Sequence, residues 1–105
     1  MEKKYVLAFD EVVLRQLETA AKNLAIQSLL TKMLDKIERL GPRAGELLDF
    51  RLGLYEVKNK HPPIRLYFEY DQPTEKITIF EYEMKTSLKS QQKTIHQLRA
   101  KASKS

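Results

Sequence analysis

Basic and aromatic residues recur along three short runs, 54–60, 64–70 and 76–83, whose period-two alternation is typical of β-strands. Alternation collects one group of these side chains on the same face of the expected sheet, namely Lys58, Lys60, Arg65, Tyr67, Glu69, Tyr82 and Glu56. Guanidinium and ammonium groups bind phosphate oxygens and aromatic rings stack on nucleobases, so this face is a candidate RNA-binding surface. The alternative interpretation is a solvent-exposed sheet face that carries cross-strand ion pairs.

The C-terminal segment concentrates the positive charge of the chain. The protein has 105 residues and a formal net charge of +5. All 14 acidic residues precede residue 84, whereas residues 84–105 contain only basic charges, at Lys85, Lys89, Lys93, Arg99, Lys101 and Lys104. Such a block either faces a polyanion or an acidic partner, or forms a solvated tail that keeps the protein soluble.

Most enzyme templates are absent from the sequence. With no cysteine, the chain has no disulfide framework, thiolate metal site or cysteine nucleophile. The two histidines have no metal-ligand partner at close spacing, and the three glycines form no phosphate-binding loop. We therefore expect no metal site and no cofactor, and we assign His61 to a turn and His96 to a helix surface. Glu81 and Glu83 share one face of their strand and are interpreted as edge charges that discourage aggregation.

Composition bounds the class of protein. Hydrophobic residues make up 42% and charged residues 31% of the chain, which is typical of a globular domain with one core. No apolar run is long enough to span a membrane, and the N-terminal residues become charged again at Asp10, unlike a signal peptide. We therefore expect a cytoplasmic protein.

The elements that position the candidate residues follow the order β-α-α-β-β-β-α. Residues 3–9 predict a strand, Asp10 offers an N-cap to a first helix, and Asn23 interrupts this helix and caps the second. Gly41-Pro42 ends the second helix, because proline cannot continue it. The apolar residues of the second helix fall on one face: Ile26, Leu29, Leu30, Met33, Leu34, Ile37 and Leu40.

The C-terminal half is expected to form a meander of strands and a last helix. A polar connection through residues 43–45 leads to the three strand runs, and in the third run alternation turns Ile77 and Ile79 inward but Phe80 and Tyr82 outward. From about Ser87 a helix is predicted, and residues 100–105 are expected to fray. The fold class is therefore α+β: a single domain, residues 1–105, whose antiparallel-rich sheet carries the two N-terminal helices on one face.

The ordered pattern resembles the RelE/ParE toxin superfamily, closest to its HigB-like and phage-derived host-inhibition branch. Three segments carry the resemblance: LGLYEVK (52–58), IRLYFEY (64–70) and MKTSLKSQQKTI (84–95). They are similar to a family strand, to the following strand with its arginine, and to the lysine-rich start of the final helix. Together with the two leading helices, the resemblance covers nearly the whole chain.

The resemblance implies a RelE-like fold and the toxin of a type II toxin–antitoxin pair, with the cognate antitoxin as partner and a toxin–antitoxin heterotetramer as one expected assembly. Such toxins cleave mRNA, often on the ribosome, without metal. A base deprotonates the ribose 2′-OH, which attacks the adjacent phosphate, and an acid protonates the leaving 5′-oxygen. We accordingly expect an endoribonuclease that inhibits translation.

Site roles are carried over by position. Arg65 is expected to stabilise the transition state, and Lys58 either does the same or accepts a proton. Tyr82 would stack on a base or orient a phosphate, and Glu46 lies in the segment where some members place a glutamate base. The expected RNA-binding residues are Lys60, Tyr67, Lys85, Lys89 and Lys93.

The segment FEYEMK (80–85) departs from the family, whose last strand often ends in His, Tyr or an Arg–Lys pair. Glu81 and Glu83 also bring negative charge to where RNA would lie. These departures favour an alternative on the same fold: a non-catalytic or ParE-like module that binds a protein, either gyrase or the antitoxin. Lys58, Arg65 and Lys85 favour the ribonuclease. Both hypotheses predict that an acidic or amphipathic partner segment docks onto the sheet or the last helix.

Overall fold

The computed structural model describes residues 4–84 of the chain. In chain order its elements are β1 (Val6–Phe9), α1 (Glu11–Ala20), α2 (Leu24–Leu40), the short 3₁₀ helix η1 (Gly41–Ala44), β2 (Glu46–Asp49), β3 (Leu54–Asn59), β4 (Ile64–Asp71) and β5 (Lys76–Met84). The predicted α+β class and the leading strand–helix–helix order are confirmed, whereas β2 was not predicted. The predicted C-terminal helix, with Lys85, Lys89 and Lys93, lies outside the described residues.

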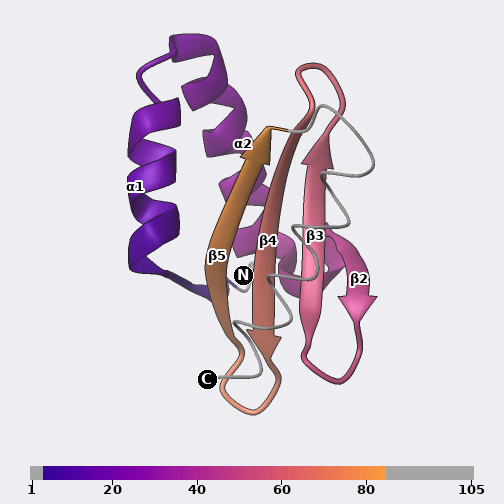
Figure 1. Cartoon of the computed structure of the whole chain (residues 1–105). Helices are drawn as coiled ribbons and strands as arrows, with labels where there is room; N and C mark the ends of the chain where they lie inside the picture. Colours follow the sequence, from indigo (N-terminus) through magenta and orange to yellow (C-terminus); the bar gives the residue numbers. More distant parts are fainter. Residues whose placement is uncertain (1–3, 85–105) are drawn as a thin grey trace.

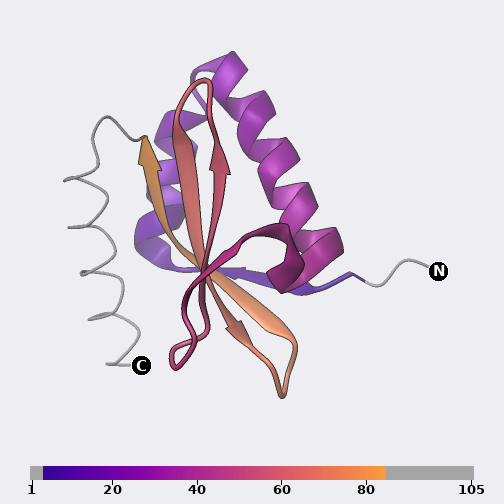
Figure 2. The same cartoon turned by 90° about the vertical axis from the view of Figure 1, so that its right-hand side faces the viewer.

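The five strands form one mixed sheet in the order β1-β5-β4-β3-β2. β1 runs parallel to β5, and every other neighbouring pair is antiparallel, as an antiparallel-rich sheet requires. α1 packs against β5 and α2 against β3 (Figure 1). Figure 2, turned by 90°, shows α2 alongside the strongly twisted sheet. Both helices pack on one face of the sheet, and the opposite face is here called the outer face.

Local signals in the sequence set the ends of both helices. The Asp10 carboxylate accepts a hydrogen bond from the Val12 N–H (2.8 Å), and the Asn23 side chain accepts bonds from the first turn of α2, so both predicted N-caps are confirmed. α2 ends at Gly41, whose φ of +62° favours glycine. A Cβ there would lie 2.5 Å from the Tyr5 ring. Neither helix of the described residues is long and apolar enough to cross a membrane.

The hydrophobic core lies between the helices and the sheet. Phe68 is fully buried near its centre and stacks on the Tyr55 ring, with 5.3 Å between centroids. The predicted inward faces are confirmed, because the buried cluster comprises Val13, Leu17, Ile26, Leu30, Met33, Ile37, Ala44, Val57, Ile64, Leu66, Phe68, Ile77 and Ile79. Alternation of period two along the strands and of 3.6 along α2 therefore points to the same core.

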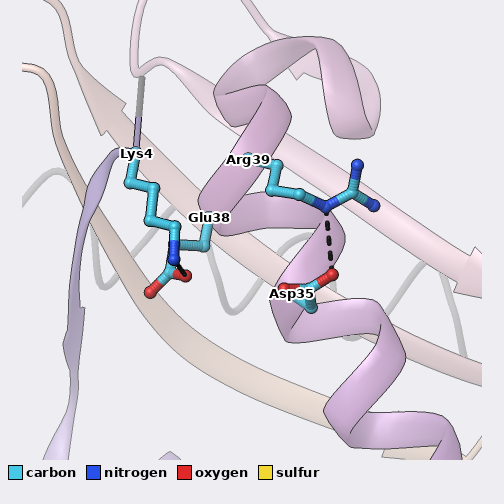
Figure 3. Close-up of polar contacts among 4 residues, drawn as sticks. All are labelled: Lys4, Asp35, Glu38 and Arg39. Carbon is cyan, nitrogen blue, oxygen red and sulfur yellow. Dashed lines mark hydrogen bonds and ion pairs between the residues drawn. The ribbon is translucent and has the colours of Figure 1, made fainter. Parts of the chain in front are cut away.

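The start of β1 is attached to the end of α2. The Tyr5 N–H donates to the Glu38 carbonyl (2.8 Å), and the Lys4 ammonium lies 3.8 Å from the Glu38 carboxylate (Figure 3). Next to Glu38, Arg39 pairs at 3.0 Å with Asp35, which lies one turn earlier in α2, and both of these side chains are exposed. Such exposed ion pairs add little stability, so the backbone bond contributes more to this attachment than the ion pair does.

A β-bulge in β5 changes which face its last residues occupy. Tyr67 pairs with Glu81 and Phe68 pairs with Ile79, which leaves Phe80 as the extra residue. Beyond the bulge Tyr82 pairs with Leu66 and packs against the helix-side core. The prediction that Tyr82 shares the outer face with Phe80 is therefore wrong, because a simple alternation contains no inserted residue.

Candidate functional site

The outer face brings several predicted site residues together in two neighbouring rows across the strands. In one row Lys58 on β3 pairs with Arg65 on β4, which pairs with Glu83 on β5. The second row runs through Glu46, Glu56, Tyr67 and Glu81, from β2 to β5. Lys58 and Arg65 are thus directly opposite on the same face. Two like charges in this position destabilise a sheet, unless an anion binds between them.

Arg65 is held by a carboxylate on the neighbouring strand. Its Nη1 lies 2.7 Å from Oε2 of Glu56, and the two side chains are 18% and 2% exposed. A charge-assisted bond of this length fixes the guanidinium and compensates part of its charge. This contact agrees with the alternative interpretation of the face as a set of cross-strand ion pairs. Lys58 makes no ion pair with any residue in the range 4–84 and is exposed.

Tyr67 is buried rather than presented to solvent. Its hydroxyl donates to Oε1 of Glu83 (3.1 Å), and its ring joins a second small apolar cluster with Leu54 and Phe80. Burial, together with the nearby charges of Glu83 and Glu56, raises the pKa of Tyr67 well above its usual value. The phenol therefore stays protonated at neutral pH. Its burial argues against the predicted role of this ring in stacking on RNA.

A cationic hollow of about 370 Å³ lies at the turn between β3 and β4. Its lining residues are Lys58, Asn59, Lys60, His61, Pro63 and Arg65. The Asn59 side chain donates to the Pro62 carbonyl (2.9 Å) and so fixes the turn that carries His61. Two exposed lysines, an arginine that is already bonded to Glu56 and an imidazole therefore surround one hollow, and cations of this kind can bind a phosphate group.

A second hollow, of about 320 Å³, adjoins the first through Lys58. It is lined by Lys36, Ala44, Gly45, Glu46, Glu56, Val57 and Lys58, so it contains the carboxylates that the first hollow lacks. β2 approaches β3 closely at Gly45, where a Cβ would lie 2.3 Å from the Glu56 carbonyl oxygen. Glu46 pairs with Glu56 across these strands and lines the same hollow as Lys58. Lys58 therefore lies between a carboxylate hollow and a cationic one.

Tyr82 lies apart from these residues, on the helix side of the sheet. It lines an apolar hollow with Val12, Arg15, Gln16, Thr19 and Ala20, and burial raises its pKa. Its backbone N–H donates to Oε1 of Gln16 (3.3 Å), where β1 no longer pairs with β5. The structure therefore does not bring Tyr82 to Lys58 and Arg65.

His61 is the residue of this site that the sequence pattern did not single out. Its neighbours Pro62 and Pro63 mark a turn, and an isolated histidine in a turn has no metal-ligand spacing. The available signal was its position one residue after Lys60, at the end of a basic strand. Among residues 4–84, no group of three or more His, Asp or Glu side chains could hold a metal ion.

The fold of this chain is that of the RelE-like toxins, as the following solved structures show. The chain is similar to the isolated RelE toxin of E. coli, with a TM-score of 0.63 and 16% identity, over 90% of this chain and 98% of that chain. A RelBE2 toxin–antitoxin complex from Mycobacterium tuberculosis matches with a TM-score of 0.64 and 16% identity, over 83% and 98%. The intact E. coli RelBE complex matches with a TM-score of 0.61 and 18% identity, over 79% and 99%. No protein-family model and no curated protein matches the sequence.

Proposed function

We propose that this protein is the toxin of a type II toxin–antitoxin pair, of the HigB-like branch, and that it cleaves mRNA on the outer face of its sheet. The observation that carries the proposal is the cationic hollow at Lys58, Lys60 and Arg65 on a RelE-like fold. Proteins of this fold have been crystallised with a RelB antitoxin, and a cognate antitoxin is the expected partner here.

The proposed reaction transfers the phosphate within the RNA strand. The ribose 2′-oxygen attacks the adjacent phosphorus, a P–O2′ bond forms, and the P–O5′ bond breaks to leave a 2′,3′-cyclic phosphate and a 5′-hydroxyl. Glu46 accepts the 2′-proton from the hollow that it shares with Lys58. Lys58 and Arg65 bind the nonbridging oxygens, where negative charge increases in the transition state. Side chains alone supply these groups, so we propose that the cleavage is metal-independent.

Further basic residues would extend the contact with RNA. Lys60 lies at the edge of the cationic hollow, and Lys85, Lys89 and Lys93 follow β5 in a segment without acidic residues. Phosphate contacts of this kind position a strand without reading its sequence, and they weaken as the salt concentration rises. Tyr82 receives no role in this mechanism, because it lies on the other face of the sheet.

The test is induced expression in a bacterial host with mRNA 5′ ends mapped within minutes. Lys58→Ala removes a cation of the hollow, whereas the matched control Lys32→Ala removes an exposed lysine on α2. We expect new cleavage ends with the wild type and the control, and a loss of about 100-fold or more with Lys58→Ala. Equal cleavage by Lys58→Ala and Lys32→Ala would exclude the hollow as the site.

A second candidate function is binding to a protein target, gyrase or the antitoxin, without catalysis. The bond between Arg65 and Glu56 favours it, since this carboxylate compensates part of the charge that a phosphate would use. Growth arrest with intact mRNA, unchanged by Lys58→Ala, would support this function over the ribonuclease.

A further inference from the structure

His61 lies where the proposed reaction needs a proton donor. It is exposed at the β3–β4 turn and lines the cationic hollow together with Lys58, Lys60 and Arg65. The bond from Asn59 to the Pro62 carbonyl closes the turn around it. A guanidinium retains its protons throughout the neutral range, whereas imidazole is the side chain that most readily exchanges one there.

Glu46 and His61 line two different hollows that share Lys58. In an in-line displacement the attacking and leaving oxygens lie on opposite sides of phosphorus, so the base and the acid must also lie on opposite sides. Glu46 pairs with Glu56, two residues before Lys58 on β3, and His61 follows Lys58 by three residues. At a strand rise of about 3.3 Å per residue, Glu46 is displaced from Lys58 by about 7 Å toward the start of β3, whereas His61 lies in the turn beyond the end of that strand.

We propose that the His61 imidazolium donates its proton to the 5′-oxygen as the P–O5′ bond breaks. The 2′-proton passes to Glu46, the electron pair of the broken bond stays on the 5′-oxygen, and the proton from His61 makes it a hydroxyl. This role rests on the proposed ribonuclease function. It gives the site a base and an acid, each in a hollow that Lys58 also lines.

A change of leaving group isolates this proton transfer. The purified protein is tested on a short RNA, free and bound to bacterial ribosomes, that has either the natural 5′-oxygen or a 5′-bridging sulfur at the cleaved linkage. A thiolate leaves without being protonated, so the sulfur substrate needs no acid. The variants are His61→Asn, Lys58→Ala and, as a matched control, His96→Asn at the other histidine of the sequence.

We expect His61→Asn to cleave the oxygen substrate about 100- to 10,000-fold more slowly than the wild type and the sulfur substrate close to the wild-type rate. Lys58→Ala should slow both substrates, and His96→Asn should leave the ratio between them unchanged. If His61→Asn slowed the cleavage of both substrates equally, or of neither, the role of His61 would be overturned while the ribonuclease function would stand. A wild type that cleaves neither substrate, free or on ribosomes, would overturn the ribonuclease and this role with it.

Discussion

Truncation of Arg65 tests whether the candidate site also stabilises the fold. The guanidinium lies 2.7 Å from a Glu56 carboxylate that is 2% exposed, while the arginine side chain is 18% exposed. When an ion pair is buried, removal of one partner costs about 3–5 kcal/mol. When the pair is exposed, the whole interaction is worth only about 0–1 kcal/mol. Because Arg65 keeps some contact with water, we expect Arg65→Ala to lower the free energy of unfolding by about 2–4 kcal/mol.

Thermal and urea unfolding followed by circular dichroism measure this loss. For a domain of this size, it corresponds to a fall in Tm of about 10–20 °C. The double-mutant cycle adds Glu56→Gln and the double variant. Since the neutral amide leaves no buried charge behind, the double variant should be more stable than the sum of the two single effects predicts, by about 1–3 kcal/mol.

An additive cycle together with a loss below about 1 kcal/mol for Arg65→Ala would refute this reasoning. The Arg65 side chain would then interact with water about as favourably as with Glu56, and the short distance between them would not stabilise the fold. The expected result has a practical consequence for the cleavage experiments. Arg65→Ala would lose activity partly by unfolding, so Lys58→Ala is the cleaner test of the hollow.

Three further predictions concern neighbouring residues. Tyr67→Phe removes a partly buried hydrogen bond and should lower the free energy of unfolding by about 1 kcal/mol in urea unfolding. Folding raises the pKa of Tyr67, so above about pH 10 the unfolded state loses the phenol proton first and the protein becomes less stable. The urea midpoint of the wild type should therefore fall as the pH rises above about 10. Tyr67→Phe should make this fall smaller. Gly45→Ala places a Cβ 2.3 Å from the Glu56 carbonyl oxygen and should cost about 1–3 kcal/mol by urea unfolding, with lower RNA cleavage as β2 shifts. Lys58→Gln removes the like charge opposite Arg65, so it should raise Tm while it abolishes cleavage, and a fall in Tm would contradict the like-charge argument.

The sequence predicts those parts of the fold that depend on local signals. The ends of the helices are set by single residues: the side chains of Asp10 and Asn23 cap the starts of α1 and α2, and the backbone conformation of Gly41 ends α2. Nearby residues are therefore enough to predict these ends. β2 could not be found in this way. It has only four residues, two of them exposed, and it is defined by its pairing with β3. The bulge at Phe80 is also non-local, since it depends on the register between β4 and β5.

In the candidate site, too, the sequence predicts what depends on local pattern and misses what depends on three-dimensional packing. Alternation correctly places Lys58 and Arg65 on one face, because they belong to regular strands. It cannot show that Glu56 is buried against Arg65, which depends on how the strands lie in three dimensions. It also cannot select His61, because the turn, and not a periodic pattern, brings that residue to the hollow.

The charges of the outer face are easier to explain by binding than by folding. Lys58 and Arg65 lie directly opposite each other, an arrangement that by itself weakens the sheet. Glu56 offsets part of this cost, but it does so by pairing with Arg65 and leaves Lys58 exposed without an ion pair in the described range. An isolated protein would gain stability from an acidic or neutral residue at position 58. A cation there contributes most when an anion occupies the hollow, and under the proposed function that anion is an RNA phosphodiester.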